Sequence, residues 1–194
     1  MRDIFFFAGA AAALALIISV SLIYDPRGAP TMPVSVGSGP RDLVRVDELN
    51  LNRFRTTPRD TISMIRREDQ PYFVKITSRR NSDFPTNARD VANIPLATDL
   101  ELAFAQRNLK ITITARSSTE NGSPAMRAKY SASSDHSSAW YTFLLTPEWE
   151  DYSFYFSPPE SPNERGLDFL AVWADPDGLG RGVEVQKIEF DARS

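Results

Sequence analysis

The chain has 194 residues, of which 42% are hydrophobic and 24% are charged, with a formal net charge of −3 and no cysteine. This length and composition predict one folded domain of ordinary size. The lack of cysteine excludes disulfides, thiolate zinc sites, iron–sulfur clusters and a cysteine nucleophile. A single histidine, His136, excludes most histidine-rich metal sites and leaves one candidate for a catalytic histidine.

The first predicted element is an apolar helix near the N-terminus. Residues 4–23 contain no charge, and at about 1.5 Å per residue they form a helix about 30 Å long, which matches the hydrocarbon core of a bilayer. The run is longer than the apolar region of a cleaved signal peptide, so an uncleaved signal anchor over residues 1–24 is favoured over cleavage. Gly9 and Ala13 share one face, where small side chains would let a second membrane helix pack closely.

A spacer of residues 25–40 follows the predicted anchor. It contains four prolines and three glycines, a composition typical of a linker that holds a folded unit away from the membrane. A short N-terminal tail usually stays in the cytoplasm. We therefore expect a single-pass protein of the inner membrane, with a domain of residues 41–194 in the periplasm.

From residue 41 onward the hydrophobic pattern alternates with a period of two. Ile111, Ile113 and Ala115, for example, alternate with polar residues, as in a strand with one wet face. Turn sequences rich in Asn, Asp, Gly and Pro separate the candidate strands, which favours an all-β sandwich or barrel with one helical turn at residues 99–106. The strands are expected at residues 43–46, 61–65, 72–77, 110–116, 126–130, 139–145, 152–156, 168–174 and 182–190.

Four segments of this region carry a resemblance to a known family. They are ITITARSS at residues 111–118, AMRAKYSA at 125–132, WYTFLLTPEWEDYSFYFSPP at 140–159 and FLAVWADPDGLGRGVEVQKIEF at 169–190. Together they resemble the second half of a jelly-roll carbohydrate-binding module, a β-sandwich of the galactose-binding-like type. The resemblance implies an all-β, jelly-roll β-sandwich, and the apolar run at residues 4–23 predicts that a single N-terminal transmembrane helix precedes it. Many members of this superfamily bind no sugar and act as structural or partner-binding domains, so the fold does not name the function.

Aromatic residues are the candidate sugar contacts, because a flat ring stacks on the apolar face of a pyranose. Alternation over residues 152–156 turns Tyr155 away from the apolar face, whereas Trp173 lies in a segment that is apolar on both faces and is expected in the core. Trp149 begins a strand, and its position is usually structural in the resembled family. The candidate ligand-binding residues are Tyr141, Tyr155 and Trp140.

A structural calcium ion is a second option, since jelly rolls of the resembled kind often carry one. Asp175 and Asp177, together with Asp168 and Glu184, supply the oxygen ligands that calcium prefers. However, Asp-Pro-Asp-Gly at residues 175–178 is also typical of an ordinary turn, and its spacing is not that of a calcium loop. The turn is the favoured interpretation, and the sequence indicates no other cofactor.

Catalysis and nucleic-acid binding are disfavoured. His136 lies in a serine-rich run at residues 131–138, where adjacent residues of one polar hairpin loop cannot converge as a catalytic triad does, so we predict no catalytic residues and no enzyme. Residues 41–116 carry 14 basic and 10 acidic side chains, whereas residues 117–194 carry 6 and 13. Ion pairs on strand faces explain the arginine-rich half better than an acidic ligand or lipid surface, and the net charge argues against nucleic acid.

Two classes of function remain. The first is a non-catalytic, membrane-anchored, extracytoplasmic binding domain for polysaccharide or another envelope glycan. The second is an accessory structural subunit of a membrane protein complex, in which the anchor packs on other transmembrane helices and the sandwich caps the periplasmic face. A glycan-binding assay separates the two, because only the first requires a sugar ligand.

Overall fold

The computed structural model describes residues 33–35, 42–68, 70–80, 88–132, 136–160 and 168–192. All of them belong to one unit of the chain, which extends from Thr31 to Ser194. The anchor predicted for residues 1–24, with its packing residues Gly9 and Ala13, lies outside the described residues, as does most of the predicted spacer. Among the residues that are described, none forms a helix with the length and apolar character needed to span a bilayer.

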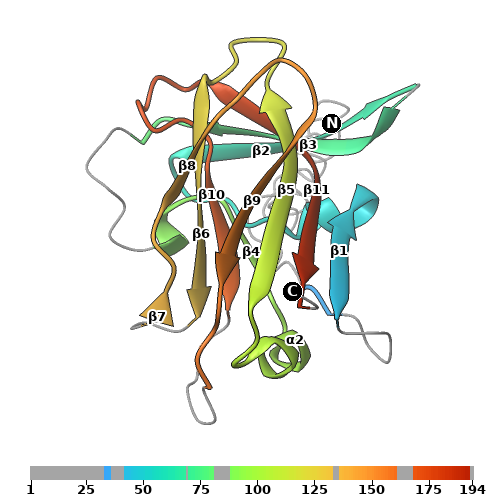
Figure 1. Cartoon of the computed structure of the whole chain (residues 1–194). Helices are drawn as coiled ribbons and strands as arrows, with labels where there is room; N and C mark the ends of the chain where they lie inside the picture. Colours follow the sequence, from blue (N-terminus) through green and yellow to red (C-terminus); the bar gives the residue numbers. More distant parts are fainter. Residues whose placement is uncertain are drawn as a thin grey trace, which may run out of the picture. The chain divides into compact units, whose positions relative to one another are not determined.

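Six antiparallel strands form the larger of two sheets (Figure 1). β11 lies at its centre, with β5 along one side and both β3 and β1 along the other, while β9 extends the sheet beyond β5 and β2 extends it beyond β3. The strand bounds are β1 Leu43–Asp47, β2 Asp60–Arg67, β3 Gln70–Ser78, β5 Leu109–Ser117, β9 Glu150–Phe156 and β11 Gly182–Asp191.

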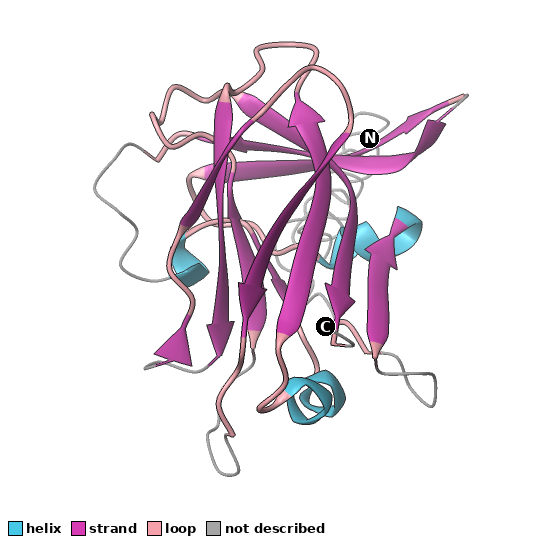
Figure 2. Ribbon diagram, viewed as in Figure 1, coloured by secondary structure: helices cyan, strands magenta, loops and turns pink. Residues whose placement is uncertain are grey.

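Five shorter strands form the second sheet, in which β6 pairs with β10, β7 and β8, and β10 also pairs with β4. In the described parts of the chain, helical structure is confined to short segments at the margins of the sheets (Figure 2). The strands are β4 Asn93–Pro95, β6 Ala125–Ala132, β7 His136–Ser137, β8 Tyr141–Leu144 and β10 Phe169–Trp173, and the helical segments are η1 Glu48–Arg53, η2 Ala88–Asp90 and α2 Thr98–Phe104.

These elements confirm the predicted all-β sandwich. Each of the nine expected strands overlaps an observed strand, and the expected helical turn at residues 99–106 corresponds to α2. β8 is shorter than predicted, because only Tyr141–Leu144 pairs with β6. The short strands β4 and β7 were not predicted, since two or three residues carry no readable alternation.

The main core lies between the two sheets and is built by alternate side chains of each strand. On β5, Ile111, Ile113 and Ala115 are fully buried in it, and on β11 so are Val183 and Val185. Because successive side chains of a strand point to opposite faces, the intervening residues lie on the outer faces of the sandwich. The predicted burial of one face of these strands is therefore confirmed.

A second apolar cluster lies on the outer face of the five-stranded sheet. Phe169, Ala171 and Trp173 of β10 pack there against Ala88 and Val91, which come from η2 and the residue that follows it. The alternate residues of β10 belong to the main core, so this strand is buried on both faces. The predicted core position of Trp173 is confirmed, since its side chain is fully buried.

One residue from the predicted spacer is part of the sandwich. Val34 is 5% exposed, its N–H donates to the Pro95 carbonyl at 2.9 Å, and its carbonyl accepts from the Ala97 N–H at 2.8 Å. This short bridge adds Val34 to the chain beside β4. The segment predicted as linker over residues 25–40 thus contains a residue that the domain uses for packing and hydrogen bonding.

Candidate functional site

The outer face of the six-stranded sheet carries a row of polar side chains on β9 and β5. These residues point away from the main core, because their strand neighbours, such as Phe154 and Ile113, are buried in it. Thr112 Oγ1 lies 2.9 Å from Ser153 Oγ, and Thr114 Oγ1 donates to Asp151 Oδ1 at 2.5 Å. The cross-strand pairs are Asp151 with Thr114, Ser153 with Thr112 and Tyr155 with Lys110.

Tyr155 is the most exposed aromatic residue in the part of the chain that the structure describes. It is 52% exposed, whereas the other described aromatic residues are buried or half-buried. It points away from the core, as the alternation over residues 152–156 predicts. A partly exposed ring beside hydroxyl and carboxylate groups is a suitable surface for stacking and hydrogen bonding with a sugar.

Trp149 lies on the same face, just before β9 begins. The guanidinium carbon of Arg116 is 4.3 Å from the centre of its ring, and Phe73 packs edge-on at 5.6 Å between ring centres. Arg116 is itself buried and forms an ion pair with the buried Glu184, whose carboxylate also accepts from the Ser118 hydroxyl. From sequence alone Trp149 is expected to be structural, and no local pattern identifies Arg116.

Tyr141 lies at the seam between the two sheets rather than on an outer face. Its ring stacks on Phe154 with 4.6 Å between ring centres, and it packs against the main core. Its hydroxyl donates to the Tyr155 carbonyl at 3.2 Å. Tyr141 therefore supports the backbone that carries Tyr155.

Trp140 lies on the outer face of the other sheet. Its ring contacts Trp173 edge-on at 6.0 Å between centres, and the Lys129 ammonium is 5.8 Å from its centre. It packs against the second apolar cluster. The structure therefore does not bring Tyr141, Tyr155 and Trp140 together, and it leaves Tyr155 as the one of the three on the outer face of the six-stranded sheet.

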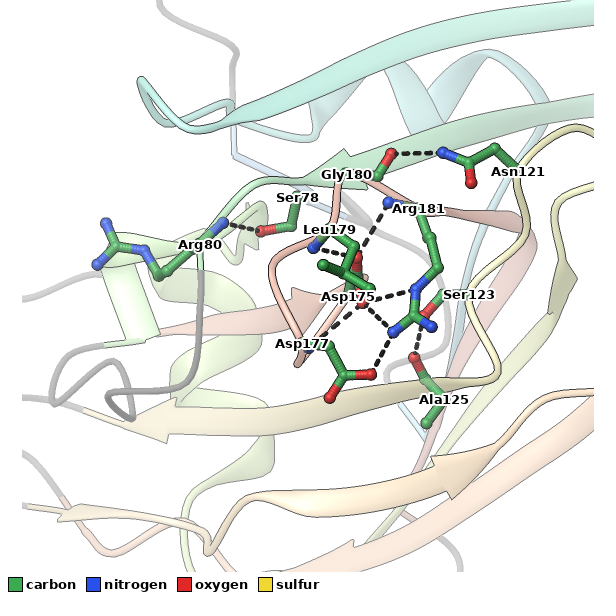
Figure 3. A network of polar contacts seen from close by, with 10 residues as sticks. All are labelled: Ser78, Arg80, Asn121, Ser123, Ala125, Asp175, Asp177, Leu179, Gly180 and Arg181. Atoms are coloured by element: carbon green, nitrogen blue, oxygen red, sulfur yellow. Dashed lines mark hydrogen bonds and ion pairs between the residues drawn. The ribbon is translucent and has the colours of Figure 1, made fainter.

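The predicted turn at residues 175–178 is organised by Arg181 (Figure 3). One oxygen of the buried Asp175 carboxylate accepts from the Arg181 guanidinium at 2.7 Å, and the other accepts from the N–H groups of Leu179 and Arg181 at 2.8 and 3.0 Å. The same guanidinium pairs with Asp177. Burial alone would raise the pKa of Asp175, but the hydrogen bonds and charge of Arg181 outweigh burial and lower that pKa below its ordinary value of 3.8.

The residues proposed for a structural calcium do not fit the ion. The Arg181 guanidinium already contacts the carboxylates of Asp175 and Asp177. Both carboxylate oxygens of Asp175 accept hydrogen bonds from Arg181, so neither is free for a calcium ion. The other two acids belong elsewhere, because Asp168 accepts from the Tyr130 hydroxyl and Glu184 pairs with Arg116. Among the described residues, no group of three or more metal-binding side chains comes together.

Asp168 takes part in a buried network inside the sandwich. The Tyr130 hydroxyl donates to its carboxylate at 2.7 Å, while its backbone N–H donates to Glu101 at 2.7 Å. Burial raises the pKa of Tyr130 well above its ordinary value, and the Asp168 carboxylate raises it further. Burial also raises the pKa of Glu101. These groups link α2 to β6 and β10, and we assign them a structural role.

His136 is an exposed residue of β7, opposite Ala132 in a hairpin with β6. The serine beside it, Ser137, lies 3.1 Å from the Ser131 hydroxyl, and Ser138 accepts from the Tyr130 backbone N–H and donates to the Ala139 carbonyl. These hydroxyls serve the hairpin rather than a nucleophile–base pair.

Comparison with known proteins identifies the fold of this chain but does not assign it to a family. No protein-family model matches the chain, and no curated protein matches it in sequence. Solved structures do match: the CBM22-2 xylan-binding domain of Paenibacillus barcinonensis Xyn10C aligns with a TM-score of 0.54 at 9% identity, over 77% of this chain and 98% of that domain. The CBM22-1 xylan-binding domain of the same protein gives 0.53 at 6%, over 78% and 94%.

A third similar structure contains a catalytic module as well. The CBM22-1–GH10 modules of Clostridium thermocellum endo-1,4-β-D-xylanase 10B, complexed with xylohexaose, align with a TM-score of 0.52 at 11% identity. The match covers 78% of this chain but only 28% of the xylanase chain. These similarities confirm the predicted jelly-roll fold of the carbohydrate-binding-module type, and at such low identity they establish the fold alone.

Proposed function

We propose that this chain is a non-catalytic, membrane-anchored, extracytoplasmic polysaccharide-binding domain that uses the outer face of the six-stranded sheet. The observation that carries the proposal is the half-exposed ring of Tyr155 at the end of a row of hydroxyl and carboxylate side chains on β9 and β5. The ring offers a stacking surface, and the exposed Asp151 and half-buried Ser153 of the row offer an acceptor and a donor to sugar hydroxyls. The strands beneath are hydrogen-bonded over their whole length, so the row is rigid before a ligand arrives.

Two further observations support the proposal. The similar structures include two xylan-binding domains and a complex with xylohexaose, so the fold is compatible with such ligands in those proteins. Within the polar row, Asp151 is exposed and Ser153 is half-buried, while the buried Thr112 and Thr114 hold these two side chains in place.

The anchored location rests on the sequence. The twenty uncharged residues at 4–23 are long enough to cross a bilayer, and the short N-terminal tail favours a cytoplasmic N-terminus. A sandwich on the periplasmic side would meet envelope or exported polysaccharides.

A glycan array with the full-length protein tests the proposal. We expect a signal from at least one polysaccharide, and we expect Tyr155→Ala to weaken it about 3- to 10-fold without changing the fold. Leu144→Ala, an exposed side chain of the five-stranded sheet, is the matched control and should bind as the wild type does. A silent array would reject glycan binding and would favour the accessory-subunit function instead.

A further inference from the structure

Two aromatic rings lie on the same outer face, at opposite ends of β9. Trp149 and Tyr155 are six positions apart and share the parity of Asp151 and Ser153 between them. A strand rises about 3.3 Å per residue, so the two rings are separated by about 20 Å along the sheet. β9 is paired with β5 from Glu150 to Phe156, so the spacing between the rings is fixed by the sheet.

The ring of Trp149 is held from below by a charged network. The Arg116 guanidinium lies against it at 4.3 Å and reaches the Glu184 carboxylate at 2.7 Å, while the Ser118 hydroxyl donates to the same carboxylate at 3.1 Å. Glu184 is 1% exposed and Arg116 is 8% exposed, so this ion pair lies in a low-dielectric environment. The planar guanidinium of Arg116 is held by Glu184, and it therefore constrains the orientation of the Trp149 indole that stacks on it.

Phe73 adds an apolar wall to this arrangement. It is fully buried although its neighbour Val74 faces the main core, so Phe73 lies on the outer face and is covered there. Trp149 and the guanidinium groups of Arg67 and Arg116 surround it. The half-buried Trp149 thus has one part of its surface packed and another part in contact with solvent.

We infer that Trp149 is a second stacking position of the polysaccharide site, and that the ligand is a linear oligosaccharide long enough to reach both Trp149 and Tyr155. Arg116 and Glu184 are positioning residues that hold the Trp149 ring. This inference rests on the proposed function. Between the two rings, Asp151 and Ser153 face the same ligand and supply an acceptor and a donor for sugar hydroxyls. A single sugar ring is much shorter than the separation of about 20 Å and engages one platform only.

Titration calorimetry of the full-length protein with saccharides of increasing length tests the inference. The probes are xylohexaose, cellohexaose and laminarihexaose, each with its own disaccharide. At least one hexasaccharide is expected to bind about tenfold or more tightly than its disaccharide, because the longer ligand engages a second ring. Trp149→Ala should remove that gain, so that the hexasaccharide binds this variant about as tightly as its disaccharide does. Trp149→Phe, which retains a ring, should restore part of the gain.

Trp140→Ala is the matched control, since Trp140 is also half-buried but lies on the outer face of the five-stranded sheet. It should keep the full preference for the hexasaccharide. A hexasaccharide that binds no more tightly than its disaccharide would overturn the inference and leave the proposed function standing. If no hexasaccharide binds, both fail.

Arg116→Lys separates positioning from folding. Lysine keeps the positive charge beside Glu184 but lacks the planar group that stacks on Trp149. We expect the advantage of the hexasaccharide over its disaccharide to fall several-fold. A parallel fall of both affinities would show that Arg116 only maintains the fold and would contradict its positioning role.

Discussion

The outer faces of the two sheets differ in chemical character. In both sheets, however, the side chains of each strand alternate between the core and the outer face. On the five-stranded sheet, the outward residues of β10 are apolar, and η2 with Val91 covers them. On the six-stranded sheet, the outward residues of β5 and β9 are mainly Thr, Ser, Asp and Lys, and they end in the half-exposed ring of Tyr155. The difference teaches that one outer face contributes to the stability of the domain, whereas the other leaves side chains such as Asp151 and Tyr155 exposed to solvent.

The largest expected effect comes from the covered face. Trp173→Ala removes a fully buried ring beside Phe169 and leaves a cavity, so it should lower the free energy of unfolding by about 3–5 kcal/mol in urea titrations. Trp140→Ala, at the half-buried margin of the same cluster, should cost less. Equal losses for the two variants would mean that the cluster is not a second core.

The turn between β10 and β11 joins the covered strand to the centre of the open sheet. Removing one partner of a buried ion pair costs about 3–5 kcal/mol, and the 20% exposure of the Arg181 side chain reduces the expected loss for Arg181→Ala to about 2 kcal/mol. Arg45→Ala, from an ion pair in which Arg45 is 59% exposed, is the control and should cost no more than about 1 kcal/mol.

The same turn gives a prediction about metal ions. Because the Arg181 guanidinium already pairs with both Asp175 and Asp177, EDTA should leave the thermal unfolding midpoint of the wild type unchanged. A midpoint that rises with added calcium and falls with EDTA would contradict the assignment of the guanidinium as the partner of these acids.

A smaller, pH-dependent effect is expected at Asp175. Its pKa is lowered in the folded protein, so its contribution to stability is present above the unfolded-state value of 3.8 and is lost as the pH falls through the lower folded-state value. Asp175→Asn removes this contribution but keeps one acceptor oxygen. The difference in unfolding free energy between wild type and variant should therefore be constant above about pH 5 and should shrink below pH 3.8. If the difference in unfolding free energy grew as the pH fell, this would contradict a lowered pKa of Asp175 in the folded protein.

The smallest expected effect on stability comes from the open face. Tyr155→Ala removes a ring that is half in water and should change the free energy of unfolding by no more than about 0.5 kcal/mol. The comparison of Tyr155→Ala with Trp173→Ala shows how much more an aromatic side chain contributes to stability on the covered outer face than on the open one. A loss above 2 kcal/mol would show that Tyr155 is part of a packed cluster.

Much of the fold could be predicted because its signals are local. Alternation over Ile111, Ile113 and Ala115 marks the inner face of β5, and an apolar pattern on both faces marks β10 as buried. Tyr155 could be placed on the outer side by the same parity. The turn at residues 175–178 was also readable, because Asp-Pro-Asp-Gly is a local turn signature, but the pairing of Asp175 with Arg181 was not predicted.

The rest depends on contacts between distant parts of the chain. Arg116 and Glu184 are 68 residues apart in sequence, and nothing local in either segment identifies their pairing. The same holds for Arg116 and Trp149, whose stacking requires β5 and β9 to be neighbours. Val34 was missed because it lies in a segment rich in proline and glycine, where composition favours a linker.

The central position of β11 has a consequence for the order in which the domain folds. β11 pairs with β1, β3 and β5, and its end at Asp191 meets Leu43 at the start of β1. The six-stranded sheet therefore cannot assemble while β11 is still being synthesised or translocated, and the earlier strands stay without their central neighbour. Pairings between such distant segments are typical of sandwiches that fold over milliseconds to seconds, about the slow end for domains of this size. The domain therefore stays incompletely folded until β11 is available to pair with its three neighbours.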